Sequence, residues 1–198
     1  AITPVPGFSG EMQQEASGKI VGPIMRELAR MGTPFAGCLF PGFKITSEGL
    51  KVLEFNARFG DPEFPACVRR MKTDLYPIMN ACIDGTLSEH KVEWDECYAV
   101  SIVLASGGYP IRYETGFPIS GIEKAEKIPG VVIFHSGTIL TDGILRTAGG
   151  RVLQVTATGH TLRNALQSAY RAVWCIYFNK MHFRNDIGVK ALLEESKI

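Results

Sequence analysis

The chain has 198 residues, of which 45% are hydrophobic and 21% charged, a composition typical of a soluble globular protein with one large core or two small ones. Lysine and arginine number 21 against 20 acidic residues, so no net field favours nucleic acid or an anionic membrane as a partner. No apolar run approaches the roughly 20 residues that a transmembrane helix needs, so we expect no membrane-spanning helix in this chain.

The cysteines and histidines indicate neither a disulfide framework nor a zinc site. The five cysteines are an odd number without a C-x-x-C pair, and the four histidines are scattered. This usage fits a reducing cytoplasm, with the cysteines as small core residues.

The first half predicts helices around a β-hairpin. Apolar residues at the helical period predict a helix over 11–31, kinked or divided at Gly22-Pro23. Residues 36–46 and 50–59 predict two strands joined across Ser47-Glu48-Gly49. Residues 62–70 and 75–84 predict further helices, the second with Asp74 as N-cap and Gly85 as its stop.

The second half predicts an antiparallel β unit closed by a helix. The expected strands are 98–105, 131–140, 144–147 and 151–158, with a turn at Thr141-Asp142-Gly143. The helix follows Gly159, with Thr161 as N-cap and an apolar stripe that runs to Ile176. We therefore expect an α+β protein with domains at 1–95 and 96–198.

The decapeptide from Glu54 to Glu63 carries the strongest chemical pattern. In a strand, Glu54, Asn56 and Arg58 share one face. The opposite face, which we expect to be packed, carries Leu53, Phe55, Ala57 and Phe59. An ordinary half-buried strand, on which Glu54 and Arg58 only pair with each other, is the alternative interpretation.

The polar face could bind a metal cation together with an anion such as a phosphate. Glu54 and Asn56 offer hard oxygen ligands, and magnesium sites for nucleotide phosphates take only one or two of these from the protein. Arg58 adds a planar guanidinium group, which can donate two parallel hydrogen bonds to phosphate or carboxylate oxygens. Gly60-Asp61-Pro62 then predicts a turn before the next helix.

Two glycine pairs and two histidines allow a ligand role but favour a structural one. Gly107-Gly108 and Gly149-Gly150 are more typical of tight turns than of phosphate loops, because neither opens a helix in a strand-loop-helix cradle. His135 and His160 have no serine or cysteine partner that the sequence identifies, so we expect structural histidines.

The run Val52-Leu53-Glu54-Phe55-Asn56-Ala57-Arg58-Phe59-Gly60-Asp61-Pro62-Glu63 closely resembles the signature of phosphoribosylamine–glycine ligases, the glycinamide ribonucleotide synthetases of purine synthesis. The resemblance covers essentially the whole chain. It continues in family order through 70–75, 105–110, 134–138, 149–157 and 184–188.

The resemblance implies the C-terminal half of an ATP-grasp domain, an antiparallel sheet with helices, followed by a small β-rich C-terminal domain. It implies an ATP-dependent ligase with Mg²⁺ (or Mn²⁺) that activates glycine as an acyl phosphate, which the amine of 5-phosphoribosylamine attacks. Under it Glu54 and Asn56 become metal ligands and Arg58 the catalytic residue that holds the transferring phosphate. Gly60, Asp61 and Glu63 become substrate-binding residues.

The resemblance also implies that parts of the enzyme lie outside this chain. The lobe that bears the lysines, glycine-rich loop and adenine contacts of an ATP-grasp enzyme has no counterpart in residues 1–198. We expect a fragment whose partners are the N-terminal lobes of the same protein, and which alone neither makes glycinamide ribonucleotide nor binds ATP tightly.

The sequence departs from the family pattern at three places. Pro41 and Lys44 lie in the first hairpin arm, where Pro41 predicts a bulge or an edge, and Phe64-Pro65 replaces a small residue followed by glutamine. Ala57 stands where cysteine is common and is expected to face the core. These departures leave two alternatives: a non-catalytic scaffold domain that retains the fold, or another ATP-grasp carboxylate–amine ligase.

Overall fold

The computed structural model describes residues 1–195, and the chain divides into two compact units that are described separately. The hairpin unit comprises Pro6–Gly60 and Met71–Trp94. The sheet unit comprises Ala1–Val5, Asp61–Arg70 and the chain from Asp95 onward. Two short segments of the first half thus belong to the compact unit of the second half. The division into domains 1–95 and 96–198 stays a prediction.

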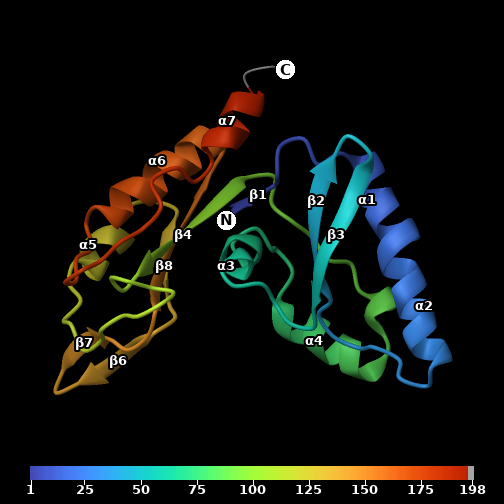
Figure 1. Ribbon diagram of the computed structural model, residues 1–198, viewed down its shortest axis with the longest axis horizontal. Helices are drawn as coiled ribbons and strands as arrows, with labels where there is room; N and C mark the ends of the chain where they lie inside the picture. The colour runs from blue at the N-terminus through green and yellow to red at the C-terminus, as the bar shows by residue number, and fades with distance from the viewer. Residues whose placement is uncertain (196–198) are drawn as a thin grey trace. The chain divides into compact units, whose positions relative to one another are not determined.

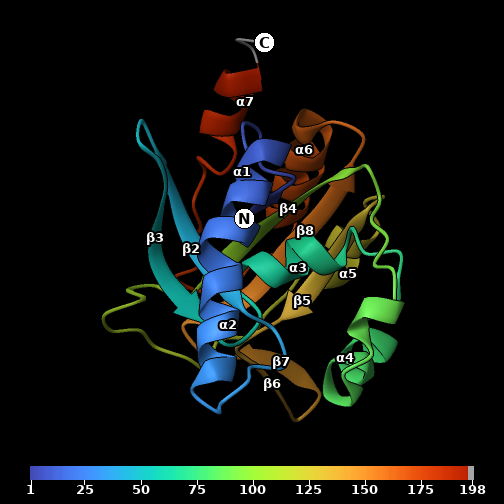
Figure 2. The same cartoon turned by 90° about the vertical axis from the view of Figure 1, so that its right-hand side faces the viewer.

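The hairpin unit contains one helical rod beside a two-stranded sheet (Figures 1 and 2). Its elements are α1 (Gly10–Glu15), the π-helix η1 (Ala16–Val21), α2 (Gly22–Arg30), β2 (Phe40–Thr46), β3 (Gly49–Asn56), α4 (Leu75–Asp84) and the 3₁₀ turn η2 (Leu87–Glu89). The chain remains helical through Gly22-Pro23, where the π-helix gives way to α2. Pro23 lies in the first turn of α2, directly after this change from π-helical to α-helical structure.

Local signals in the hairpin unit are confirmed. Strands β2 and β3 pair antiparallel, and their register shifts between Gly42 and Phe43, beside the proline at position 41 that predicted a bulge. Helix α4 begins at its N-cap Asp74, whose Oδ1 accepts from the Tyr76 amide at 3.0 Å. It ends at Gly85, whose φ of 72° is left-handed.

The expectation of a packed apolar face on β3 is wrong for this chain. Leu53 is 68% exposed, Phe55 is 40% exposed, and Ala57 and Phe59 are exposed as well. The reason is that, among the described residues, no other layer covers this face of the two-stranded sheet of β2 and β3. A face that alternation marks as apolar becomes buried only when another layer covers it.

The sheet unit is built on a four-stranded antiparallel sheet in the order β1-β4-β8-β5, whose strands are labelled across Figures 1 and 2. Its elements are β1 (Ile2–Thr3), α3 (Glu63–Val68), β4 (Tyr98–Ala105), α5 (Ile122–Glu126), β5 (Val131–His135), β6 (Thr138–Thr141), β7 (Ile144–Thr147), β8 (Arg151–Gly159), α6 (Leu162–Val173) and α7 (Val189–Glu195). Strands β6 and β7 form a separate hairpin. The antiparallel sheet and helices confirm the expected α+β class.

The single strand expected over 131–140 is wrong, because it breaks into β5 and β6. The amides of Ser136 and Gly137 both donate to the carbonyl of Val152, at 3.0 and 3.1 Å. Two adjacent amides on one acceptor cannot continue a regular ladder, so the chain turns there. The hairpin turn at Asp142-Gly143 is confirmed, with φ of 52° and 74° at its two residues.

The core of the sheet unit lies between one sheet face and α6. Buried residues of β4, β8 and α6 contribute to it, among them Val100, Ile102, Leu104, Leu153, Val155, Ala157, Leu162, Ala165, Leu166, Ala169 and Val173. Ile176 is also buried but lies after the helix end. The other sheet face carries three buried polar residues, Ser101, Gln154 and Thr156.

The five cysteines are free thiols of intermediate exposure. Their expected place in the core is therefore wrong, since each is only partly buried. Within residues 1–195, no helix combines the length and the apolar character that a bilayer crossing requires.

Candidate functional site

The decapeptide from Glu54 to Glu63 leaves β3, passes a loop and enters α3. The division between the two compact units falls between Gly60 and Asp61, so its residues are described within their own units. Gly60 is buried at the end of the hairpin unit. Pro62 caps α3, which begins at Glu63, as the sequence predicted within one residue.

Glu54 and Asn56 are brought together on β3 as the alternation predicted. Asn56 Nδ2 donates to Glu54 Oε1 at 3.0 Å. An amide that donates through nitrogen keeps its oxygen as an acceptor, so the pair presents carboxylate and amide oxygens side by side. Opposite them in β2, a β-carbon on Gly42 would lie 3.2 Å from Glu54 Cγ, so glycine leaves the Glu54 side chain room.

The donor set of Glu54 and Asn56 fits a hard divalent cation. Both offer oxygen, and two protein oxygens suffice for a magnesium ion that also binds phosphate and water. Residues 1–195 contain no cluster of three or more histidine, cysteine, aspartate or glutamate side chains that could hold a metal ion. A cation held by this chain would therefore need most of its ligands from elsewhere.

Arg58 is exposed beyond the end of β3, and its Nη1 donates to the carbonyl of Phe59 at 2.9 Å. One contact orients the guanidinium and leaves its other N–H donors available to an anion. Among the described residues no Glu54–Arg58 ion pair is found. The alternative in which these two residues only neutralise each other is thus not what the structure contains.

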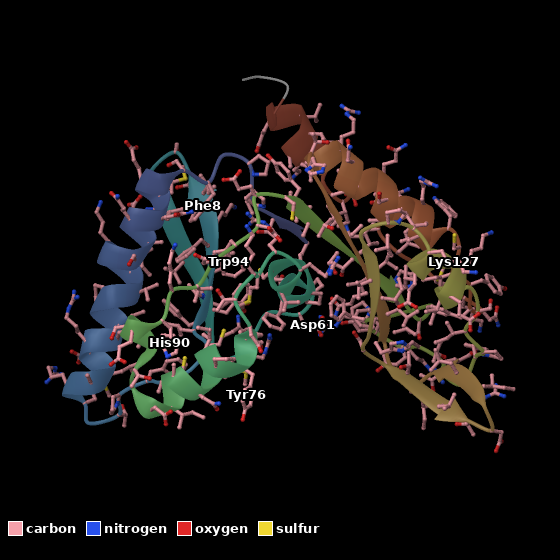
Figure 3. The ribbon with its side chains drawn as sticks, turned by 180° about the vertical axis from the view of Figure 1, so that it is seen from behind. Phe8, Asp61, Tyr76, His90, Trp94 and Lys127 are labelled. Carbon is pink, nitrogen blue, oxygen red and sulfur yellow. The ribbon has the colours of Figure 1, made fainter. Side chains whose placement is uncertain are left out.

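Asp61 is held through both its side chain and its carbonyl, and Figure 3 labels it at the loop that leads into α3. Its Oδ1 accepts from Gln154 Nε2 at 2.8 Å, and its Oδ2 lies 3.3 Å from Arg151 Nη2. Its carbonyl accepts from Arg151 Nη1 at 3.0 Å. The side chain is nevertheless 40% exposed, so part of the carboxylate faces solvent.

Glu63 lines a cavity of about 370 Å³ within the sheet unit. Its lining includes Pro62, Glu63, Ser101 and Arg184. Arg184 Nε and Nη2 donate to the two carboxylate oxygens of Asp186, at 2.8 and 2.7 Å, which keeps the pKa of Asp186 below its ordinary value. The residues that line the cavity thus include an acidic residue, Glu63, and a basic residue, Arg184, which are of the kinds that bind polar ligands.

Sequence reasoning missed Arg151 and Gln154 as partners of Asp61. A usable signal was present, because Gln154 and Thr156 are polar positions at period two within an otherwise apolar strand. A polar residue on a buried strand face needs a hydrogen-bond partner. The sequence does not say that this partner lies 93 residues away.

Gly107-Gly108 lies in a turn and Gly149-Gly150 in a bend, as their interpretation as tight turns predicted. Ser106 donates through its amide to Gly150 O and through its hydroxyl to Gly149 O, both at 2.8 Å. A β-carbon at Gly107 would lie 2.7 Å from Lys180 Cβ. His135 Nδ1 lies 2.9 Å from Thr138 Oγ1, which is a local contact at the end of β5.

Comparison with protein families decides the relationship of the chain. Residues 1–64 match the family model described as "Phosphoribosylglycinamide synthetase, ATP-grasp (A) domain". Residues 99–190 match "Phosphoribosylglycinamide synthetase, C domain". The two models match most of the chain, in order. The chain belongs to the phosphoribosylamine–glycine ligase family.

Curated relatives agree over nearly the whole chain. The phosphoribosylamine–glycine ligase of Brucella melitensis biotype 1 is 42% identical over 195 residues, which are 98% of this chain and 46% of that protein. The ligase of Rhodopirellula baltica is 42% identical over 198 residues, 100% of this chain and 45% of that protein. The chain spans about half the length of the curated relatives it matches.

Solved structures place the fold. A phosphoribosylamine–glycine ligase from Thermotoga maritima matches with a TM-score of 0.72 and 30% identity, over 93% of this chain and 45% of that one. The N5-carboxyaminoimidazole ribonucleotide synthetase of the same organism matches with a TM-score of 0.57 and 17% identity, over 89% and 44%, and supports the fold alone. The expected fold, the C-terminal part of an ATP-grasp domain followed by a β-rich C-terminal domain, is confirmed.

Proposed function

We propose that the full-length protein that carries this chain is an ATP-dependent carbon–nitrogen ligase that joins glycine to 5-phosphoribosylamine through a glycyl phosphate, in purine biosynthesis. The observation that carries the proposal is the Glu54–Asn56 oxygen pair within the family signature, in a chain that matches two domain models of the family in order. Membership of the ligase family supports the reaction class.

Glu54 and Asn56 would hold Mg²⁺ or Mn²⁺ through one carboxylate and one amide oxygen. When bound, such a cation offsets the negative charge of the nucleotide phosphates. The 3.0 Å contact between the two side chains supports this role, because it keeps both on the same face of β3. The exposure of this face supports access for a hydrated ion.

Arg58 would bind the transferring phosphoryl group or the acyl phosphate. Its guanidinium is exposed and held at one donor only, so the planar fork can meet two oxygens of an anion. Gly60, Asp61 and Glu63 would bind substrate, with the two carboxylates accepting from hydroxyl or amine groups. No protein nucleophile is required, because phosphoryl transfer depends on positioning and charge compensation.

The domain assignment belongs to the same proposal. We assign residues 1–95 to the ATP-grasp part and residues 96–198 to the C-terminal domain, which the family matches at 1–64 and 99–190 support. The N-terminal lobes of the parent would supply the adenine contacts, so the 198-residue chain alone would be inactive. The odd cysteine number and free thiols support a cytoplasmic site of action.

The test is ligation by the full-length protein and its variants. Glu54→Ala and Asn56→Ala should each lower kcat/KM for ADP formation in the presence of glycine and 5-phosphoribosylamine by about a hundredfold or more. Part of the loss in Asn56→Ala should be regained at high Mg²⁺. The isolated 198-residue chain should show no ligation.

Glu48→Gln is the matched control. Glu48 is an exposed carboxylate of the same hairpin and pairs with Lys51 at 2.9 Å, away from the proposed metal ligands. It should retain wild-type turnover. Full activity in both Glu54→Ala and Asn56→Ala would show that other residues bind the metal. A folded full-length protein without any ligation activity would support the non-catalytic scaffold alternative.

A further inference from the structure

A chain of buried polar groups crosses the face of the sheet opposite α6. Ser101, Gln154 and Thr156 are 1%, 4% and 0% exposed. Thr156 Oγ1 donates to Ser101 Oγ at 3.1 Å, and Ser101 Oγ donates to Gln154 Oε1 at 3.4 Å. Buried polar groups on central strands cost free energy unless they are paired, so the chain needs an end that satisfies it.

That end is the carboxylate of Asp61. Gln154 Nε2 donates to Asp61 Oδ1 at 2.8 Å and to Ser136 Oγ at 3.1 Å. Because an ionised carboxylate only accepts, the Gln154 amide must present its nitrogen to Asp61, and a flip would place two acceptors together. Gln154 therefore holds Asp61 from inside the sheet with a fixed donor.

Arg151 holds the same residue from the solvent side. It contacts both the carbonyl and Oδ2 of Asp61, at 3.0 and 3.3 Å. One guanidinium thus fixes the backbone and the side chain together, which a single lysine ammonium does less well. Since Arg151 and Asp61 are 38% and 40% exposed, the electrostatic part of this contact alone is worth little to stability.

We infer that Arg151 and Gln154 are positioning residues that aim the free acceptor sites of Asp61 at a hydroxyl or amine donor of the phosphoribosylamine substrate. This inference rests on the proposed function. Two contacts occupy only part of the carboxylate's acceptor capacity, and its exposed part remains open to a ligand. Substitution of Arg151 or Gln154 should weaken binding of 5-phosphoribosylamine more than it slows the chemical step.

The experiment measures the three Michaelis constants of the full-length protein. Arg151→Met and Gln154→Met should each raise KM for 5-phosphoribosylamine about tenfold or more, while kcat and the KM values for ATP and glycine change less than about threefold. Arg151→Lys, which keeps the charge, should fall between wild type and Arg151→Met. It also serves as the readout if Gln154→Met fails to fold.

Two variants control for simple loss of a hydrogen bond. Arg146, on β7 of the separate hairpin, donates through Nη1 to Gly116 O at 3.1 Å, so Arg146→Met removes a comparable backbone contact. Thr156→Val removes a buried hydroxyl from the same polar chain without touching Asp61. Neither should change KM for 5-phosphoribosylamine.

A double-substitution cycle tests whether the two residues act through Asp61. In an Asp61→Ala background, Arg151→Met should have no further effect on KM for 5-phosphoribosylamine. A further effect there, an equal rise of all three KM values, or an unchanged KM in Arg151→Met would overturn the inference. Absence of ligation by the folded wild-type protein would instead overturn the proposed function.

Discussion

Gly150 and Tyr109 lie in direct contact, so that a β-carbon at position 150 would sit 2.6 Å from Tyr109 Cε2. The Tyr109 ring meets Tyr113 edge to face, with centroids 5.9 Å apart. Next to this contact, Ser106 donates to the carbonyls of Gly149 and Gly150. Glycine at position 150 therefore lets the loop after β4 close onto the start of β8.

Gly150→Ala should destabilise the sheet unit by about 1–2 kcal/mol, because the half-buried Tyr109 ring must move and lose its contact with Tyr113. Urea unfolding of the chain measures the change. A double-mutant cycle with Tyr109→Ala tests whether the Tyr109 ring causes the loss. The changes in unfolding free energy of Gly150→Ala and Tyr109→Ala should then add up to clearly more than the change in the double variant. Additive effects would place the strain elsewhere.

The sequence predicts correctly those helix ends and turns that depend on neighbouring residues in the chain. Helix α4 begins at Asp74 and ends at Gly85 as predicted, because an N-cap side chain and a left-handed glycine act within one turn. The β6–β7 turn followed from Asp142-Gly143 for the same reason. The short elements β1, α5 and α7 carry too few residues to display a period.

What the sequence could not supply depends on distant parts of the chain. The break after β5 arises because two amides share the carbonyl of Val152. The exposure of Leu53 and Phe55 reflects the absence of a covering layer among the described residues, which alternation cannot reveal. Strand geometry predicts that Glu54 and Asn56, the candidate metal ligands, are neighbours, whereas the partners of Asp61 come from a strand 90 residues away.

Gly85→Ala should cost the hairpin unit about 1 kcal/mol. The position is left-handed, with φ of 72°, and no atom lies within 4 Å of a β-carbon there, so the cost is conformational rather than steric. Asparagine tolerates this conformation better, and Gly85→Asn should cost less. Gly18→Ala, a helical glycine that also has open space, should stabilise the chain by a few tenths of a kcal/mol in the same urea titration.

Thr161→Val should cost about 1 kcal/mol, because it removes the N-cap of α6. Thr161 Oγ1 accepts from the Asn164 amide at 3.2 Å, and valine has the same shape without the oxygen. Thr161→Ser keeps the acceptor and should stay near wild type. Amide hydrogen exchange should quicken in the first turn of α6 in the valine variant, and unchanged exchange there would contradict the role of the cap.

Tyr170 links α6 to the segment that precedes α7. Its hydroxyl donates to Arg184 O and accepts from the Ile187 amide, both at 3.1 Å. Burial raises the pKa of Tyr170 above its ordinary value of 10.0, so the folded state favours the neutral phenol. Tyr170→Phe loses both hydrogen bonds and should lower the free energy of unfolding by about 1–2 kcal/mol at neutral pH.

The raised pKa of Tyr170 fixes how that difference changes with pH. The neutral phenol contributes its full stability below about pH 10, and this contribution is lost as pH rises through the folded-state pKa. The gap in unfolding free energy between wild type and Tyr170→Phe should therefore stay constant at pH values up to about 10 and narrow at pH values above it. Tyr177→Phe is the control, because Tyr177 is 64% exposed and should give almost no gap at any of these pH values. A gap that widens above pH 10 would show that the folded state favours the phenolate instead.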